Sequence, residues 1–296
     1  MNGLGHARAP STGDPRRLRQ KLIEVLEGHQ RAEPHAGSRS YLDRLCAGLQ
    51  SADMQMPRFP EVARELDRLL ADDEPNEREL LRTVSEEPGL VQEIWRVAST
   101  APYTAAPRRL DQAMTRVGID RLWQLGVKQA MAAEHFLAPG FEQEVASCRK
   151  AAVVGAEISG WLAGERRGTV YLGALLRDLG ALWALSRVVG DTPRDRPRRA
   201  LVERIVADYH ADLTLVALDT WSMGDDVRVA ASHHHHAQAA PRHQGAAAFV
   251  ALGELAARAA QAPDEGERLA REMLHWLHDP AQVRRVIVRA QGLWAA

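Results

Sequence analysis

The sequence predicts an all-α fold. Apolar residues recur every three or four positions along most of the 296-residue chain, which is the period of an α-helix that buries one face. No segment alternates apolar and polar residues over more than a few positions, and no Asn-Gly or Asp-Gly pair joins two such segments as a hairpin turn. With 45% hydrophobic and 26% charged residues, the composition is that of a globular protein.

The first forty residues are predicted to be an extension that carries one amphipathic helix. Residues 1–15 are rich in Gly, Pro, Ser and Thr and are expected to lack structure. Residues 16–29 place four apolar side chains on one helical face, so this helix is expected to pack back on the body of the protein. Residues 31–40 contain proline and glycine and are predicted to be a linker.

Residues 41–138 are predicted to form an N-terminal helical lobe. Asn76 and Glu79 have the spacing of a capping box, which predicts a helix start. Pro88 is placed to open the next helix, since its missing N–H is not needed there. Gly118 is placed to end a further helix in a left-handed conformation.

A second helical lobe is predicted over 139–262, beginning after Pro139-Gly140. It opens with a long helix at 142–164, followed by a strongly apolar helix at 170–187. Shorter helices are predicted at 199–209, 211–221 and 224–236. The C-terminal residues 263–296 are predicted to add helices that complete the fold.

Charge, cysteine content and motifs exclude several classes of protein. A net charge of -1 and a pI near 6.9 give no reason to expect nucleic acid as a partner. Two distant cysteines without a CxxC spacing exclude a zinc ribbon or a disulfide framework. No P-loop, GxGxxG or GxSxG motif is present, so no cofactor is expected. Without an apolar leader or a run of 18 apolar residues, the chain is expected to be cytoplasmic and not to bind membranes.

Two segments carry the candidate functional residues. The segment YLGALLRDLGAL (171–182) is apolar except for Arg177-Asp178, which predicts either an ion pair or a helix end, because an unpaired buried acid is costly. The segment 210–236 begins with His210, contains Trp221 and ends in four consecutive histidines, His233–His236.

Five segments in this order resemble the HDOD domains, a branch of the HD phosphohydrolase superfamily that mostly lacks the catalytic metal residues. The resemblance extends from about residue 42 to about residue 255. In the last segment, His210, Trp221, His234 and His235 are in register with the family pattern. The five segments are MPRFPEVAREL (56–66), VSEEPGLVQEIWRVASTAPY (84–103), LDQAMTRVGIDRLWQL (110–125), YLGALLRDLG (171–180) and residues 210–235.

The resemblance implies a two-lobe helical fold with a degenerate HD lobe. It also implies a bacterial signal-transduction module that acts by binding a partner protein or a small ligand. HD hydrolases hold metal with a histidine from one helix, a His-Asp pair from the next, and later ligands. Here Arg177 replaces the histidine of that pair, and no histidine lies between His135 and His210. We therefore expect neither an enzyme nor a bound metal. Glu254 lies near the position of the last catalytic Asp.

The expected binding site is a groove between the lobes. Its candidate residues are Arg177, Asp178, His210, Trp221, His234 and His235.

Alternatives remain for Arg177 and for the histidines. Arg177 either pairs with Asp178 and fills the vestigial pocket, or contacts a nucleotide such as a cyclic dinucleotide. In the second case it would act with the arginines of the loop at 194–199. The histidine run is expected to be partly charged at a helix C-terminus, in preference to adventitious binding of Zn²⁺ or Ni²⁺. The rival enzyme hypothesis has Asp178 and three histidines (210, 234 and 235) gathering one metal to hydrolyse a phosphoester.

Cys148 is expected to be a packing residue. Its neighbours Arg149 and Lys150 could lower its pKa, but such surroundings are common among buried cysteines.

Overall fold

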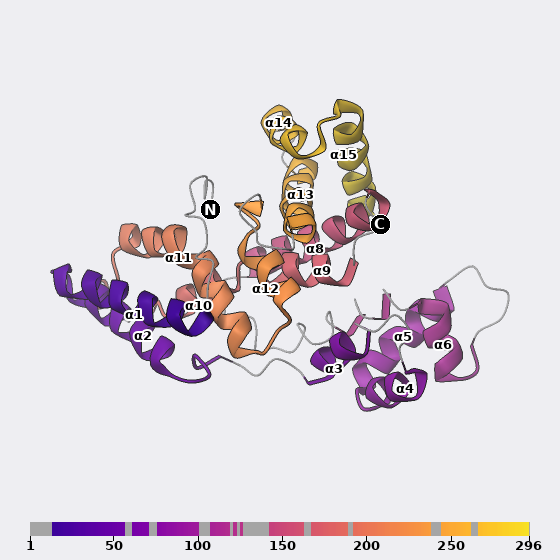
Figure 1. Ribbon diagram of the computed structural model, residues 1–296, viewed down its shortest axis with the longest axis horizontal. Helices are drawn as coiled ribbons and strands as arrows, with labels where there is room; N and C mark the ends of the chain where they lie inside the picture. The colour runs from indigo at the N-terminus through magenta and orange to yellow at the C-terminus, as the bar shows by residue number, and fades with distance from the viewer. Residues whose placement is uncertain are drawn as a thin grey trace. The chain divides into compact units, whose positions relative to one another are not determined.

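The computed structural model is built entirely from helices over the residues that it describes (Figure 1). The described residues are 14–56, 61–70, 76–100, 107–118, 121–122, 125–126, 142–162, 167–188, 192–237, 244–261 and 266–295. No strand is present in these ranges, so the predicted all-α class is confirmed. The unstructured start predicted before Asp14 and the boundary predicted at Pro139-Gly140 lie outside them.

The chain divides into two compact units, with boundaries that differ from the predicted lobes. The smaller unit is 57–137, and the larger one combines 1–56 with 138–296. Residues 41–56 therefore belong with the C-terminal part of the chain. The predicted linker at 31–40 is also wrong in its second half, because helix α2 begins at Ala36. The His35 side chain caps that helix by accepting a hydrogen bond from the Ser38 amide.

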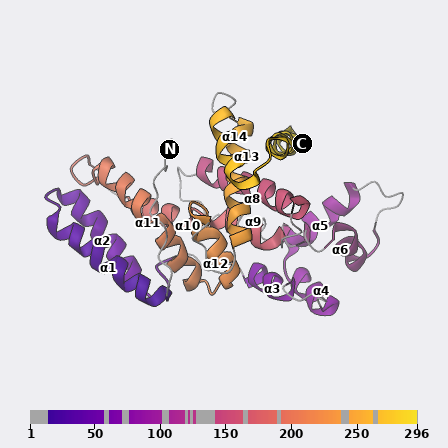
Figure 2. The same cartoon turned by 45° about the horizontal axis from the view of Figure 1, so that its top comes forward.

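The first two helices, α1 (Pro15–Ala32) and α2 (Ala36–Gln50), pack on each other, and α1 also packs on α11 (Arg199–Thr220) (Figures 1 and 2). Arg19 of α1 donates hydrogen bonds to the Thr220 hydroxyl at 2.5 Å and to the Ser51 carbonyl at 3.0 Å. The prediction that the N-terminal helix packs on the body is therefore confirmed.

A second contact fixes the end of α2. Trp183 of α10 (Leu179–Ser186) donates its indole N–H to the Met54 carbonyl at 2.9 Å. Met54 lies in the turn after α2 and has a left-handed backbone, with φ of 53°. Gly48 faces the same indole, and a Cβ there would lie 2.6 Å from the Trp183 ring. The absence of a side chain at residue 48 therefore leaves room for the Trp183 indole against α2.

The smaller unit begins with four short helices that the structure describes in full. They are α3 (Glu61–Leu70), α4 (Glu77–Ser85), α5 (Pro88–Thr100) and α6 (Leu110–Val117). The predicted helix starts are confirmed at Asn76, whose side chain accepts from two backbone amides, and at Pro88. Gly118 ends α6 with a φ of 79°, as predicted.

The larger unit is organised around α8, α9 and α13. Its helices after residue 138 are α8 (Glu142–Leu162), α9 (Arg167–Leu176), α10, α11, α12 (Asp225–Ser232), α13 (Gln244–Gln261), α14 (Gly266–Leu277) and α15 (Pro280–Ala295). Small residues let α8 and α13 approach at backbone distance, since a Cβ on Gly253 would lie 2.7 Å from the Gly155 Cα.

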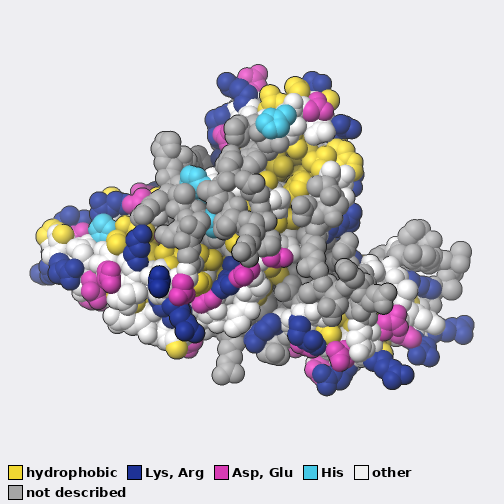
Figure 3. Space-filling model, in the orientation of Figure 1, with side chains coloured by type: hydrophobic (Ala, Val, Ile, Leu, Met, Phe, Trp, Pro, Cys, Tyr) yellow, Lys and Arg dark blue, Asp and Glu magenta, His cyan; other side chains and the backbone are white. Residues whose placement is uncertain are grey.

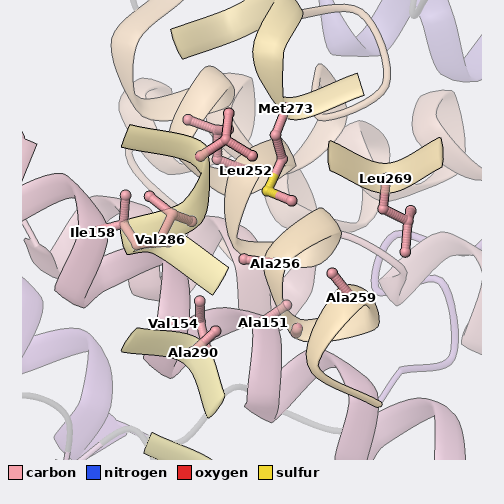
Figure 4. Packing of buried hydrophobic residues seen from close by; sticks show 12 residues of the cluster. Ala151, Val154, Ile158, Leu252, Ala256, Ala259, Leu269, Met273, Val286 and Ala290 are labelled. Carbon is pink, nitrogen blue, oxygen red and sulfur yellow. The ribbon is translucent and has the colours of Figure 1, made fainter. Parts of the chain in front are cut away.

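Apolar side chains of α8, α13, α14 and α15 form one buried cluster (Figure 4). Ala151, Val154 and Ile158 of α8 contribute, together with Leu252 and Met273 from the C-terminal helices. Burial of this cluster attaches the C-terminal helices to the larger unit. On the face drawn in Figure 3, acidic and basic side chains lie interspersed over the described helices, in keeping with the net charge of -1.

Three predicted helix boundaries are wrong. The apolar segment 170–187 is broken at Arg177-Asp178 into α9 and α10. The segments 199–209 and 211–221 form one helix, α11. His210, which was expected to separate them, is buried in the middle of that helix. The helix predicted over 224–236 ends at Ser232, so the histidine run lies in a turn. No helix among the described residues has the length and hydropathy needed to cross a bilayer.

Candidate functional site

Arg177 and Asp178 lie in the tight turn between α9 and α10. Thr214 of α11 supports this turn from outside, because its hydroxyl donates to the Arg177 carbonyl at 3.0 Å and accepts from the Gly180 amide at 2.9 Å. These bonds replace helical bonds that the break removes. Gly180 is needed here, since a Cβ would lie 2.3 Å from the His210 carbonyl oxygen. Sequence reasoning missed Thr214; its one signal is a hydroxyl within an apolar helix segment.

The Arg177 guanidinium is buried between two carboxylates. Its side chain is 3% exposed, and Nε lies 3.2 Å from Asp178 Oδ2 and 3.5 Å from Glu254 Oε2 of α13. Nε is not aligned for a hydrogen bond with either oxygen, so these are charge contacts. Nη1 donates to the Ala174 carbonyl at 3.1 Å. The pairing of Arg177 with Asp178 that the ion-pair interpretation predicted is present, with Glu254 as a second partner.

Both carboxylates are held in their charged form. Burial raises the pKa of Asp178, but the charges of Arg177, His210 and His235 and the Cys148 hydrogen bond together outweigh it and hold that pKa below its usual range. Burial also raises the pKa of Glu254, but the charges of Arg177, His234 and His235 together outweigh it and hold that pKa below its usual range. At neutral pH the turn and α13 together therefore place one buried cation beside two anions.

Cys148 of α8 adds a neutral group to this charged cluster. Its Sγ donates a weak hydrogen bond to Asp178 Oδ2 at 3.5 Å. Burial raises the pKa of Cys148 to about 12, so the idea that Arg149 and Lys150 lower it is wrong. The thiol is protonated at neutral pH and packs as a small side chain, as expected.

Three histidines from two elements meet beside the charged turn. They are His210 of α11 and His234 and His235 of the turn after α12. One ring nitrogen from each lies within 4.8 Å of the others. The His210 ring centroid is 5.7 Å from that of His234 and 5.2 Å from that of His235. Asp178 Oδ1 lies 3.9 Å from His234 Nε2, which joins this cluster to the charged turn.

The expectation that the histidine run is partly charged is wrong for three of its residues. Burial lowers the pKa of His233 and His235, and lowers that of His234 well below its usual range. Helix α12 ends at Ser232, so these histidines lie in a turn and not at helical spacing. The His234 and His235 rings lie with their centroids 3.9 Å apart and their planes tilted by 45°.

Two other candidates lie apart from this cluster. Trp221 is a buried residue at the end of α11, and eleven residues of helix place it about 16 Å along the axis from His210.

Arg177 is buried, whereas the loop arginines are exposed, so they do not form one surface. The exposed loop arginines are Arg194, Arg196, Arg198 and Arg199. A nucleotide contact by the loop itself stays a prediction, as does the groove between lobes.

The HDOD domain family matches residues 56–237 of the chain. This chain belongs to the HDOD domain family. The matched range covers most of the predicted range and includes every candidate residue except Glu254. The family assignment confirms the resemblance that the five segments predicted.

Several solved structures share this HDOD fold. A protein from Marinobacter aquaeolei VT8, provisionally described as a signal-transduction protein, aligns at 17% identity and a TM-score of 0.61 over 99% of this chain and 67% of that one. A protein from Shewanella amazonensis SB2B, provisionally described as a metal-dependent phosphohydrolase, aligns at 14% identity and a TM-score of 0.54. The alignment covers 88% of this chain and 90% of that one. An HDOD domain protein of unknown function from Geobacter sulfurreducens aligns at 19% identity and a TM-score of 0.54. The alignment covers 68% of this chain and 72% of that one. No curated protein matches. At these identities the likeness shows the fold alone.

The divalent metals of HD hydrolases fit only part of this HDOD site. Arg177 does not fit, since a guanidinium offers no lone pair and adds positive charge where a cation would lie. The imidazoles of His210, His234 and His235 do fit, because neutral ring nitrogens are good ligands for transition metals. The donor set is thus compatible with one ion and incompatible with two.

Proposed function

We propose that this HDOD domain is a non-catalytic regulatory module of signal transduction that binds a partner protein or a small ligand. Its family membership and its fold support a regulatory domain of the HD superfamily. The non-catalytic part of the proposal is carried by one observation. Arg177 Nε lies 3.2 Å from Asp178 and 3.5 Å from Glu254, where a hydrolase would hold a cation.

The chemistry of this cluster argues against a paired-metal hydrolase. A paired metal centre generates its nucleophile by lowering the pKa of a bound water, and it needs carboxylates free to coordinate the ions. Here the carboxylates of Asp178 and Glu254 are neutralised by a buried guanidinium that does not lose its charge at any accessible pH. The helix that would supply the first histidine ligand instead contributes the protonated thiol of Cys148.

A hydrolysis assay tests the proposal. Protein without a histidine tag, purified without a nickel column, is assayed with p-nitrophenyl phosphate and bis(p-nitrophenyl) phosphate in the presence of Mn²⁺, Fe²⁺ or Zn²⁺. The expected rate is equal to that of the Asp178→Ala variant. Metal-dependent turnover by the wild type that disappears in Asp178→Ala, but persists in the exposed-residue control Asp195→Ala, would overturn it.

A second candidate function is supported by the histidine cluster. Asp178, His210, His234 and His235 lie close enough to gather one metal, which could activate a water for phosphoester hydrolysis. Turnover that requires both His210 and Asp178 would favour this enzyme.

Binding by the arginines of the 194–199 loop is tested separately by calorimetry with a cyclic dinucleotide, where the absence of heat at high protein concentration excludes that ligand.

A further inference from the structure

We propose that an exposed surface on α15 and the end of α8 binds an acidic amphipathic helix of a partner protein. This α15 surface consists of Trp161, Arg285, Val288, Arg289 and Gly292. The proposal rests on the binding role proposed above and specifies the chemistry of the protein partner. It does not depend on whether the domain hydrolyses phosphoesters, so the hydrolysis assay above and the binding assay below can fail separately.

Helix α15 has two opposite faces. Val283, Val286 and Ala290 recur at helical spacing and are buried in the cluster shared with α8, α13 and α14. Residues 285, 288, 289 and 292 follow the same spacing on the other side of the helix, and all four are exposed. The first face therefore attaches α15 to the larger unit, whereas the second faces solvent.

The exposed side of α15 is basic. Its 16 residues include three exposed arginines, at 284, 285 and 289, and no Asp or Glu. Glu157 of α8 lies 3.4 Å from Arg289. Arg284 and Arg285 have no carboxylate partner among the residues that the structure describes. The surface therefore retains positive charge, and its electrostatic complement is an acidic partner.

Trp161 gives the α15 surface an apolar centre. Its side chain is 38% exposed, and the guanidinium carbons of Arg285 and Arg289 lie 5.5 Å and 5.9 Å from its ring centroid. Both distances are within the range of a cation–π contact. Because the ring holds both guanidinium groups in place, binding a carboxylate costs less side-chain entropy. Tryptophan and arginine are also the residues most enriched among those that dominate binding at protein interfaces.

Val288 and Gly292 extend this surface along α15 by one turn. Val288 is 65% exposed and adds aliphatic area beside the arginines. A glycine within a helix is less favourable than an alanine, and a Cβ at Gly292 would meet no described atom within 4 Å. Packing among the described residues therefore gives no reason for a glycine here. A glycine on an exposed helix face allows the backbone of a partner to approach closely.

The spacing of the two arginines favours a helical partner. Arg285 and Arg289 are four residues apart on α15, which places their Cβ atoms about 6 Å from each other. Two acids at positions i and i+4 of a partner helix have the same spacing, so each can accept a bidentate hydrogen bond from one guanidinium. Apolar residues beside those acids would contact Trp161 and Val288.

Other occupants fit the α15 surface less well. A symmetric contact between α15 helices of two copies would bring Arg285 and Arg289 of one copy against those of the other, and like charges repel. Nucleic acid is bound through contacts to many phosphates, whereas α15 offers three arginines.

The test uses the full chain and a fluorescein-labelled synthetic peptide of about 20 residues, long enough to form a helix, with Glu at i and i+4 and Leu on the adjoining face. Fluorescence polarisation measures the Kd. We expect saturable binding that weakens with added salt, and binding at least about 10-fold weaker when Gln replaces Glu in the peptide. The double variant Arg285→Glu/Arg289→Glu should weaken binding by at least about 10-fold.

Gly292→Gln tests the close approach of a partner without removing any contact within the chain. The new side chain enters space that is open in the described structure and favours the helix, so the thermal midpoint should not fall. Peptide binding should nevertheless weaken by at least about 10-fold, because the added side chain obstructs the partner. Unchanged binding in Gly292→Gln would overturn the proposed docking of a helix on this face.

The matched control for charge is Arg194→Glu/Arg199→Glu, which reverses two exposed arginines elsewhere and changes the net charge equally. It should bind the peptide as the wild type does, and circular dichroism verifies that each variant is folded. Equal losses in the two double variants would overturn the proposal, because they would show attraction by net charge alone. Absence of saturable binding by the wild type would also overturn it.

Three further measurements test the other occupants. They are binding of duplex DNA, binding of vesicles that contain phosphatidylglycerol, and self-association by sedimentation velocity. We expect none of the three to depend on Arg285 and Arg289. Tighter binding of DNA or vesicles than of the peptide, or self-association that the Arg285→Glu/Arg289→Glu variant abolishes, would assign the α15 surface to that occupant and overturn the proposal.

Discussion

Arg177 Nε lies 3.5 Å from Glu254 Oε2, so the turn between α9 and α10 is tied by charge to the middle of α13. The same guanidinium lies 3.2 Å from Asp178 in its own turn. One cation therefore contacts two acids, one in its own turn and one in α13. This arrangement makes Arg177 a stabilising residue whatever the domain binds, because both acids are half-buried and their other polar contacts are the Cys148 thiol and His234, at 3.9 Å, for Asp178 and Arg258, at 4.0 Å, for Glu254.

The first prediction concerns loss of that cation. Arg177→Met keeps much of the side-chain volume but removes the buried positive charge that Asp178 and Glu254 share, leaving Glu254 with the more exposed Arg258 at 4.0 Å. We expect the free energy of unfolding at pH 7, measured by urea denaturation in EDTA, to fall by about 3–5 kcal/mol. The control Arg199→Met removes an exposed i,i+4 pair with Glu203 and should change it by less than about 0.5 kcal/mol. Equal effects of the two variants would contradict this assignment.

The second prediction gives the pH dependence of that loss. The pKa values of Asp178 and Glu254 are lowered in the folded state, so their pairing stabilises the protein above the unfolded-state pKa near 4. That contribution disappears as pH falls through the lower, folded-state pKa values. The difference in unfolding free energy between the wild type and Arg177→Met should therefore be largest near neutrality and shrink below about pH 4. A difference that is constant from pH 7 to pH 3 would indicate lost packing instead of lost charge.

The third prediction tests the close approach of α10 and α11. Gly180→Ala places a Cβ 2.3 Å from the His210 carbonyl oxygen and 2.4 Å from the Thr214 amide, and neither backbone atom can move away easily. We expect a loss of about 1–3 kcal/mol in thermal or urea unfolding. Gly28→Ala is the control, because a Cβ there meets nothing within 4 Å, and it should stabilise α1 by up to about 1 kcal/mol. A tolerated Gly180→Ala would show that the two helices are farther apart.

The fourth prediction concerns Thr214, which supports the break between α9 and α10. Thr214→Val keeps the shape but removes the bonds to the Arg177 carbonyl and the Gly180 amide. Because the amide would then be buried without a partner, unfolding free energy should fall by about 1–3 kcal/mol. Thr115→Val is the control, since Thr115 is exposed and bonds only within its own helix. Similar losses in both variants would mean that the turn does not depend on Thr214.

The fifth prediction concerns the docking of α2 on α10. Trp183→Phe removes the indole bond to the Met54 carbonyl, and we expect a loss of about 1 kcal/mol. It should also speed tryptic cleavage within residues 14–56, because local opening of this segment becomes easier. Trp161→Phe alters an indole that is 38% exposed and should leave both measurements nearly unchanged. If cleavage is unaffected in Trp183→Phe, other contacts hold the segment.

Some features of this protein were readable directly from local patterns. The helical period, the cap at Asn76 and the glycine end at Gly118 depend on residues within a few positions of each other, and the structure has each of them as predicted. The order of five short motifs indicated the HDOD family, and the family match confirms it. At Arg177-Asp178 the structure has both the ion pair and the helix end that the sequence offered as alternatives. The pattern failed at His210, where one continuous helix replaces the two that were predicted.

The sequence by itself determined the helical class, the family and the charged pair Arg177-Asp178 within an apolar segment. Each of these depends on periodicity or on motif order, which are properties of the chain alone. Only the tertiary structure decided the state of the site. It joined Arg177 to Glu254 and brought His210 to His234 and His235, and it buried them together. Burial by distant helices makes the arginine a counterion and keeps the histidines neutral, because it removes the water that would otherwise solvate their charges.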